Sequence, residues 1–149
     1  MEIFRRVTAD RKAHLPLLLE ADPDEHMIGR YLERGRLYAL EDGGKTVAVA
    51  VTVDLEDGNC ELKNIAVDPS CQHRGYGSRL LRHVMAAEAP THPWMFVGTT
   101  APTEPFYAQL GFAYSHTVKN FFVDNYPEPI FEDGIQCIDM RYLKRRIKP

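Results

Sequence analysis

The segment CELKNIAVDPSCQHRGYGSRLL, at residues 60 to 81, places two glycines between an apolar run and an amphipathic run. Gly75 and Gly77 have no Cβ, so backbone N–H groups there can approach a ligand closely. A helix that begins at this point adds unpaired N–H groups and the positive end of its dipole. The segment therefore predicts a strand, an anion-binding loop and a helix, with phosphate as the usual anion. The loop alone fits a simple glycine turn equally well.

Length and composition exclude several classes of protein. The chain has 149 residues, 44% of them hydrophobic, and a formal net charge of -3. These values predict one domain, residues 1–149, with a real core and without the basic surface of a nucleic-acid-binding protein. The longest apolar run, VAVAVTV at 47 to 53, is too short to span a membrane. The first residues lack the apolar core of a signal peptide, and three scattered cysteines lack metal-ligand spacing. We therefore expect a cytoplasmic protein without a metal.

Hydrophobic periodicity predicts the element order β, α, α, β, β, β, α, β, α, β, β. Three central strands form an antiparallel meander over about residues 36 to 68, because EDGG and LEDGN carry Asp-Gly hairpin signals. An apolar stripe marks the helix after the glycine loop: Leu80, Leu81, Val84 and Met85. The fold class is α+β, a single domain whose mixed, mostly antiparallel central sheet of about seven strands is flanked by about four helices.

Several element boundaries follow from single residues. Asp10 is a candidate cap for the first helix, and Pro16 predicts a kink or a late start. Gly35 and Gly111 are candidate C-terminal glycines of the second and last helices. The C-terminal part is predicted as two strands joined by a polar loop, within 112–126 and 134–143.

Two motifs in this order resemble the GNAT superfamily of acyl-CoA N-acyltransferases. The first is the family's Gln/Arg-x-x-Gly-x-Gly/Ala, here Gln72, Gly75 and Gly77, between a strand ending at Val67 and a helix beginning near Tyr76. The second is FYAQLGF at 106 to 112, similar to the family's helix-to-strand signature. A dinucleotide-binding fingerprint is the main alternative, but it requires GxGxxG and an acidic residue ending the next strand. Neither is present.

The resemblance implies a position for acetyl-CoA. Its pyrophosphate is expected on the loop, mainly on backbone N–H groups of Gln72, His73, Arg74, Gly75, Tyr76, Gly77 and Ser78. Its pantetheine arm is expected to pair with the main chain of Ile65, Ala66 and Val67, whose side chains fit a core equally well. Arg74 also fits a solvated surface. Thr100 stands where many members have an asparagine, which puts that contact to the cofactor in doubt.

The resemblance also implies two catalytic residues. Glu61 lies eleven residues before Gln72, where some members carry a general base, although an ion pair with Lys63 is the competing interpretation. Tyr107 matches the tyrosine whose hydroxyl protonates the departing thiolate; its competing role is packing, which Phe106 and Phe112 can perform. A ping-pong route through Cys71 is disfavoured, because nothing nearby in the sequence holds it as a thiolate.

The implied function is transfer of an acetyl group from acetyl-CoA to a primary amine by direct attack in a ternary complex. The alternative is a non-catalytic acyl-CoA-binding or sensor module on the same fold; a structural protein is disfavoured by the paired motifs. A cationic small-molecule or peptide primary amine with more than one positive charge is expected, because two acidic stretches would flank the acceptor mouth. They contain Asp22, Asp24, Glu25, Glu128, Glu132 and Asp133, with Phe122, Tyr126 and Phe131 as an aromatic face. Family members often form homodimers, so a homodimer is a further expectation.

Overall fold

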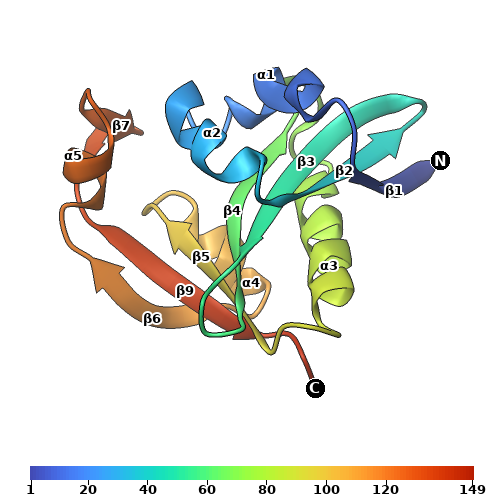
Figure 1. The fold of residues 1–149 in the computed structure, drawn as a ribbon. Helices are drawn as coiled ribbons and strands as arrows, with labels where there is room; N and C mark the ends of the chain where they lie inside the picture. Colours follow the sequence, from blue (N-terminus) through green and yellow to red (C-terminus); the bar gives the residue numbers. More distant parts are fainter.

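Seven strands form the central sheet of the computed structural model, in the order β1-β2-β3-β4-β5-β9-β6 (Figure 1). The structure describes all 149 residues. The sheet strands are β1 (Glu2–Val7), β2 (Arg36–Asp42), β3 (Lys45–Asp54), β4 (Cys60–Val67), β5 (Trp94–Thr99), β6 (Ala113–Val118) and β9 (Met140–Arg146). All neighbouring pairs are antiparallel except β4 and β5, which are parallel. The predicted α+β class and the number of strands are confirmed.

Five α-helices and two short 3₁₀ helices connect the strands. They are η1 (Arg11–His14), α1 (Leu15–Leu18), α2 (Glu25–Leu32), η2 (Pro69–Cys71), α3 (Tyr76–Glu88), α4 (Glu104–Gln109) and α5 (Phe121–Asn125). A separate two-stranded ribbon consists of β7 (Ile130–Glu132) and β8 (Ile135–Cys137). None of these helices combines the length and the hydrophobicity that crossing a membrane requires.

The central strands of the sheet are buried on both faces, whereas the edge strands β1 and β6 are more exposed. Helices α1 and α2 cover one face and α3 covers the other, as Figure 1 shows. The first face holds a core that includes Leu18, Ile28 and Leu32. The second face holds the predicted stripe of α3, since all four of its apolar residues are buried there. Strand β3 contributes buried side chains to the cores on both faces, which explains its uninterrupted apolar sequence.

Strands β4 and β5 stay paired over only part of their length. Cys60, Glu61 and Leu62 pair with β5, and the rest of β4, from Lys63 to Val67, has no partner on that side. A bulge between Val51 and Thr52 of β3 interrupts the register at this point. Because the two strands diverge here, an edge of β4 opens in the middle of the sheet, and its backbone groups are available to a ligand.

Four boundary predictions are wrong. The segment predicted as strand over 112–126 ends at Val118, and α5 follows it; the segment predicted from 134 contains β8 before β9 begins at Met140. Gly35 does not end α2 in a left-handed conformation; a Cβ there would lie within 3 Å of backbone oxygens of Tyr31 and Thr52, so it permits close approach of the chain. Asp10 makes no side-chain capping bond.

Candidate active site

A groove of about 720 Å³ runs from the open edge of β4 past the glycine loop to α4. Ile65 and Val67 line it from β4, and Phe106 and Tyr107 line it from α4. The loop contributes Cys71, Gln72, His73, Gly75, Tyr76, Gly77 and Ser78. The two sequence motifs, about thirty residues apart, therefore form opposite walls of one groove.

The loop presents an unusual concentration of free backbone donors. The N–H groups of residues 72 to 78 donate to no acceptor within the protein. His73 and Gly75 both have positive φ, 64° and 80°, which turns the chain so that successive N–H groups face the groove. The first turn of α3 adds the positive end of its dipole. This arrangement suits an anionic group such as a pyrophosphate.

Two side chains hold the loop against the sheet. The Tyr76 hydroxyl donates to Asp42 at 2.6 Å, and Arg79 makes a bidentate ion pair with Glu2 at 2.9 and 2.7 Å. The Arg79 guanidinium also donates to the carbonyl of Arg74 at 3.1 Å. The donors of the loop are therefore positioned before any ligand binds, which reduces the entropic cost of binding.

Tyr107 lies where this groove meets a second cavity. Ile65, Thr103 and Tyr107 line both the groove and a cavity of about 260 Å³ between α1, α5 and the open part of the sheet. The Tyr107 ring packs edge-to-face against Phe106 and Phe112, at 5.1 and 5.7 Å. Its hydroxyl has no hydrogen-bond partner within the protein. Burial, and then the charge of Glu132, raise the pKa of Tyr107, so the hydroxyl stays protonated at neutral pH.

The second cavity continues into a third, of about 230 Å³, beside α2. Both are lined by Asp22, Leu62, Lys63, Gly98, Tyr126 and Met140, so we describe them together as the acceptor cleft. Glu61 lies in the outer part of this cleft, with 12% of its side chain exposed. Its Oε2 is 3.3 Å from Lys63 Nζ, so the ion pair of the competing interpretation is present.

A hydrogen-bond network fixes the acidic wall of the acceptor cleft. Tyr31 and Tyr126 each donate a hydroxyl hydrogen bond to Asp22 at 3.1 Å, and Asn64 donates to the Tyr31 oxygen at 3.0 Å. Burial raises the pKa of Asp22, and these bonds oppose the rise. Across the cleft, Glu132 accepts a bond from Thr100 at 2.6 Å. The cleft thus presents two oriented carboxylates on the side nearer Tyr107.

Comparison with known proteins identifies the family. The family model for the acetyltransferase (GNAT) domain matches residues 33–114. The chain belongs to the GNAT family of acetyltransferases. It is 35% identical over 128 residues to the uncharacterized N-acetyltransferase YvbK of Bacillus subtilis, a match that covers 83% of each chain. This is the family that the two motifs resemble, and the assignment makes the protein an acetyltransferase.

Two solved GNAT structures have nearly the same fold over their whole length. A GNAT family acetyltransferase from Elizabethkingia anophelis with acetyl-CoA bound has a TM-score of 0.92 and 34% identity, covering 97% of each chain. The IAA acetyltransferase from Bacillus cereus has a TM-score of 0.88 and 32% identity, covering 98% of this chain and 99% of that one.

Most residues predicted to bind the cofactor line the groove of this GNAT protein, but three do not. The Ala66 side chain is buried in the core on the face of α1 and α2. Arg74 is exposed and outside the groove wall. Thr100 lines the acceptor cleft instead and binds Glu132 there. Thr103 was missed, although it lies four residues before Tyr107 at the start of the same helix, and this spacing places both on one face.

Of the six acidic residues predicted at the acceptor mouth, Asp22 and Glu132 line the cleft. Asp24 instead caps α2 by accepting bonds from the N–H groups of His26 and Met27. The others lie outside the lining: Glu25, Glu128 and Asp133. Phe122 and Tyr126 line the cleft as expected, whereas Phe131 is 60% exposed and points away. Sequence reasoning also missed Glu20 on the inner wall and Arg30 and Arg34 on the outer wall.

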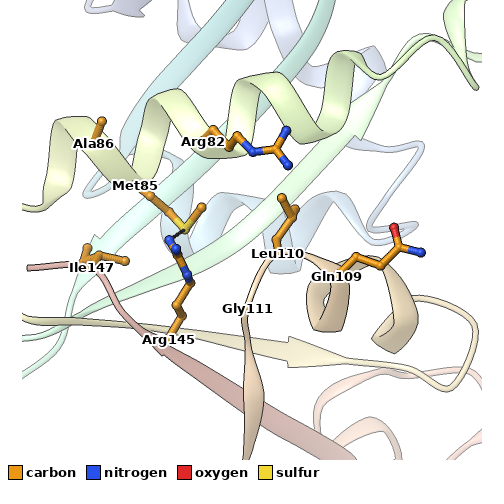
Figure 2. Close-up of a pocket in the computed structure, with 8 residues that line it drawn as sticks. All are labelled: Arg82, Met85, Ala86, Gln109, Leu110, Gly111, Arg145 and Ile147. Atoms are coloured by element: carbon orange, nitrogen blue, oxygen red, sulfur yellow. Dashed lines mark hydrogen bonds between the residues drawn. The ribbon is translucent and has the colours of Figure 1, made fainter.

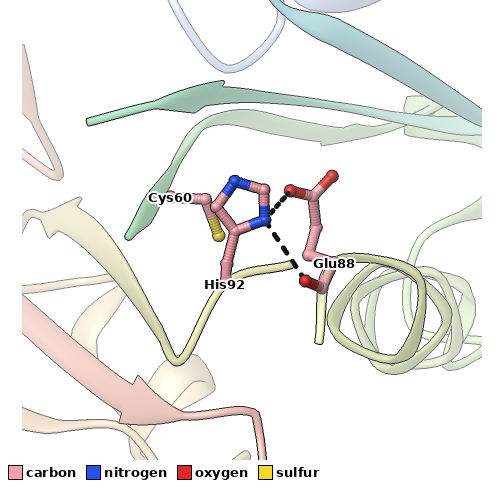
Figure 3. A group of neighbouring side chains, drawn as sticks. All are labelled: Cys60, Glu88 and His92. Atoms are coloured by element: carbon pink, nitrogen blue, oxygen red, sulfur yellow. Dashed lines mark hydrogen bonds and ion pairs between the residues drawn. The ribbon is translucent and has the colours of Figure 1, made fainter. Parts of the chain in front are cut away.

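One cluster elsewhere has the composition of a metal site: Cys60, Glu88 and His92, drawn in Figure 3. The Glu88 carboxylate, however, already accepts four hydrogen bonds from other side chains. Glu88 accepts two bonds from Arg36, at 2.8 and 2.7 Å, and further bonds from the hydroxyls of Tyr38 and Thr52. Burial opposes ionisation of Glu88, but these donors outweigh it and lower its pKa. The Arg36 guanidinium would repel a cation, so we interpret the cluster as an ion-pair network that attaches α3 to the sheet.

Proposed function

We propose that this acetyltransferase moves the acetyl group of acetyl-CoA to a primary amine by direct attack, with both substrates bound at once. The observation that carries the proposal is the meeting of two separate cavities at Ile65, Thr103 and Tyr107. One cavity suits an anionic cofactor, and the other has carboxylates that suit an ammonium group. A ternary complex needs this arrangement, because the amine must reach the thioester without displacing the cofactor.

Glu61 and Tyr107 are assigned complementary proton roles. Glu61 removes a proton from the ammonium, through a water molecule that bridges the cleft, and leaves a nitrogen lone pair. The nitrogen bonds to the carbonyl carbon, and the carbon–sulfur bond breaks with its electron pair on sulfur. The second nitrogen proton passes to solvent water, which leaves a neutral amide and the coenzyme A thiolate. Tyr107 donates a hydrogen bond to this sulfur. Its raised pKa makes complete proton transfer to a thiolate unfavourable, since an ordinary thiol has a pKa of about 8.5.

The acceptor is proposed to be a small molecule or peptide that carries a cationic primary amine. Glu20, Asp22 and Glu132 surround the inner part of the cleft, where the amine must lie to reach the thioester. Arg30 and Arg34 lie on the outer part. The inner part therefore carries three carboxylates against the one ammonium group of Lys63, which favours an acceptor with a single ammonium group.

The function is tested by thiol release from acetyl-CoA with a panel of neutral, cationic and anionic primary amines. We expect the best acceptor to be cationic at neutral pH. Glu132→Gln should raise KM for that amine about five- to tenfold at low salt, because one carboxylate facing the ammonium is lost. The increase should shrink at high ionic strength.

Glu128→Gln is the matched control, since Glu128 is an exposed carboxylate in the same loop and outside the cleft. Its KM should equal that of the parent protein. An anionic amine as best acceptor, or equal effects of the two substitutions, would show that the carboxylates do not select the substrate.

Acetyl-CoA is proposed to lie on the loop, and Gly77→Ala tests this without disturbing the fold. A Cβ at Gly77 would meet Val67 and Phe106 at 3.4 and 3.6 Å, which are ordinary contacts, and both neighbours line the groove. Alanine also has the higher helix propensity. We therefore expect unchanged or higher thermal stability and about tenfold weaker binding of acetyl-CoA by calorimetry, since the methyl group occupies cofactor space.

Gly29→Ala is the control for helix propensity, because Gly29 lies in α2 and a Cβ there meets nothing within 4 Å. Gly75→Ala is a poorer test. Its φ of 80° and a Cβ only 2.7 Å from the Arg79 guanidinium would strain the loop whether or not a cofactor binds. Equal affinity in parent and Gly77→Ala proteins would remove the phosphate-binding role of the loop.

A further inference from the structure

A cavity of about 460 Å³ lies outside the groove and the acceptor cleft, and the proposed reaction does not use it. Helix α3, the turn after α4 and the end of β9 form its walls (Figure 2). Arg82 and Met85 come from α3, Gln109 and Gly111 from the end of α4, and Arg145 from β9. Figure 2 shows the two arginines approaching the cavity from different elements, α3 and β9.

The two arginines have no carboxylate partner. The comparable residues Arg36, Arg79 and Arg141 each form an ion pair, whereas Arg82 and Arg145 form none. Arg145 is only half-exposed, and its Nη1 points at the thioether sulfur of Met85 at 3.1 Å, a weak acceptor. A guanidinium held in a partly buried place with so weak an acceptor retains most of its capacity to bind an anion.

The backbone makes room for this arrangement. Gly111 has a φ of 91°, and a Cβ there would lie 2.8 Å from Nε of Arg145. A side chain at this position would push the guanidinium out of the cavity. The glycine therefore both ends α4 and leaves room for the Arg145 guanidinium in the cavity that Arg82 also lines.

The cavity is continuous with the cofactor groove. Gln109 lines both. On α3, Ser78 lines the groove, and Arg82 and Met85 follow at i+4 and i+7, which places the three side chains along one side of the helix. Four residues of helix span about 6 Å, and an arginine side chain extends further than that. A group joined to a pyrophosphate on the loop by one ribose is within reach of this pair.

We propose that Arg82 and Arg145 bind the 3′-phosphate on the ribose of coenzyme A. The inference rests on the proposed function, because it needs the pyrophosphate on the glycine loop. The phosphate monoester carries close to two negative charges and three acceptor oxygens, which two guanidinium groups from different elements match. The protein thereby selects coenzyme A over carriers that lack this phosphate.

The test compares the calorimetric affinities of coenzyme A and 3′-dephospho-coenzyme A. The parent protein should bind the dephosphorylated form about ten- to a hundredfold more weakly. Arg82→Gln and Arg145→Gln should each weaken coenzyme A about five- to tenfold and leave the dephosphorylated form unchanged. In the double variant the two ligands should bind nearly equally. Arg82→Gln alone keeps the test valid if Arg145→Gln fails to fold, because Arg82 is exposed.

Arg146→Gln is the matched control. Arg146 follows Arg145 on β9, lies over the Trp94 ring and donates to the carbonyl of Lys148, so it points away from the cavity. It should not change the ratio of the two affinities. Equal binding of the two ligands by the parent, or a ratio that survives the double substitution, overturns the proposal.

The same titrations separate this inference from the proposed function. If the parent binds neither ligand, the position of the cofactor on the loop is wrong, and both fail together. If it binds both equally, only the phosphate site fails. A last titration uses inorganic phosphate alone. Binding of free phosphate that depends on Arg82 and Arg145, together with equal affinities for the two cofactor forms, would assign the cavity to a separate anion and overturn the proposal.

Discussion

Glu61→Gln should lower kcat by about 10²- to 10⁴-fold, the loss that follows removal of a general base. Glutamine has the same shape as glutamate but cannot accept a proton from the ammonium, so binding should change little. Steady-state thiol release over a range of acceptor concentrations measures kcat and the KM for the amine.

A competing carboxylate makes this test informative. Glu132 is the competing carboxylate, because it lines the same cavity as Tyr107 and its charge contributes to the raised pKa of Tyr107. If Glu132→Gln lowers kcat by this factor and Glu61→Gln does not, the base is Glu132. Loss of the ion pair with Lys63 is the only structural change expected from Glu61→Gln. A thermal melt shows whether that change affects folding.

The glycine loop was predictable because residues adjacent in the sequence determine its structure. The end of β4, the positive φ of Gly75 and the start of α3 at Tyr76 are all determined by consecutive residues. The left-handed conformation of Gly111 was predictable for the same reason. His73 also has a positive φ, but no residue type at that position signals it. Its conformation follows from the path of the loop.

The acceptor cleft was only partly predictable because tertiary contacts decide it. Asp22 and Asp24 are two residues apart in an irregular segment, and only the structure shows that one faces Tyr31 and Tyr126 while the other caps α2. Phe122 of α5 and Tyr126, the residue that follows this helix, stack at 5.8 Å with the spacing of a helical turn, which favours a helix over the strand that the local sequence predicts.

The geometry of the ribbon β7–β8 determines which acidic residue of the segment 128–133 faces the acceptor cleft. Ile130 and Glu132 line the acceptor cleft, and Phe131 between them is exposed, as the period of two in a strand requires. Asp133 and Gly134 both have positive φ and form the turn, so Asp133 has no access to the cleft. The alternation could have selected Glu132 from the sequence, but only if this short ribbon had been recognised.

Tyr107→Phe should lower kcat about 10- to 100-fold and leave the KM for acetyl-CoA nearly unchanged. The ring contacts with Phe106 and Phe112 persist in the variant, so the groove keeps its shape. The hydroxyl has no partner within the protein, so its removal leaves no buried group unsatisfied. What disappears is one hydrogen bond to the departing sulfur, formed as negative charge develops there, and the predicted factor corresponds to about 1.4–2.8 kcal/mol.

Two measurements separate this catalytic role from packing. Differential scanning calorimetry should show the same Tm for the parent and Tyr107→Phe proteins, since no internal hydrogen bond is lost. Tyr114→Phe is the control, because its exposed hydroxyl contacts Thr117 on β6, away from both cavities, and its kcat should equal that of the parent. Because the raised pKa keeps Tyr107 protonated well above neutral pH, its loss should lower the rate equally from pH 7 to about pH 9. A lower Tm with unchanged kcat would assign Tyr107 to packing alone.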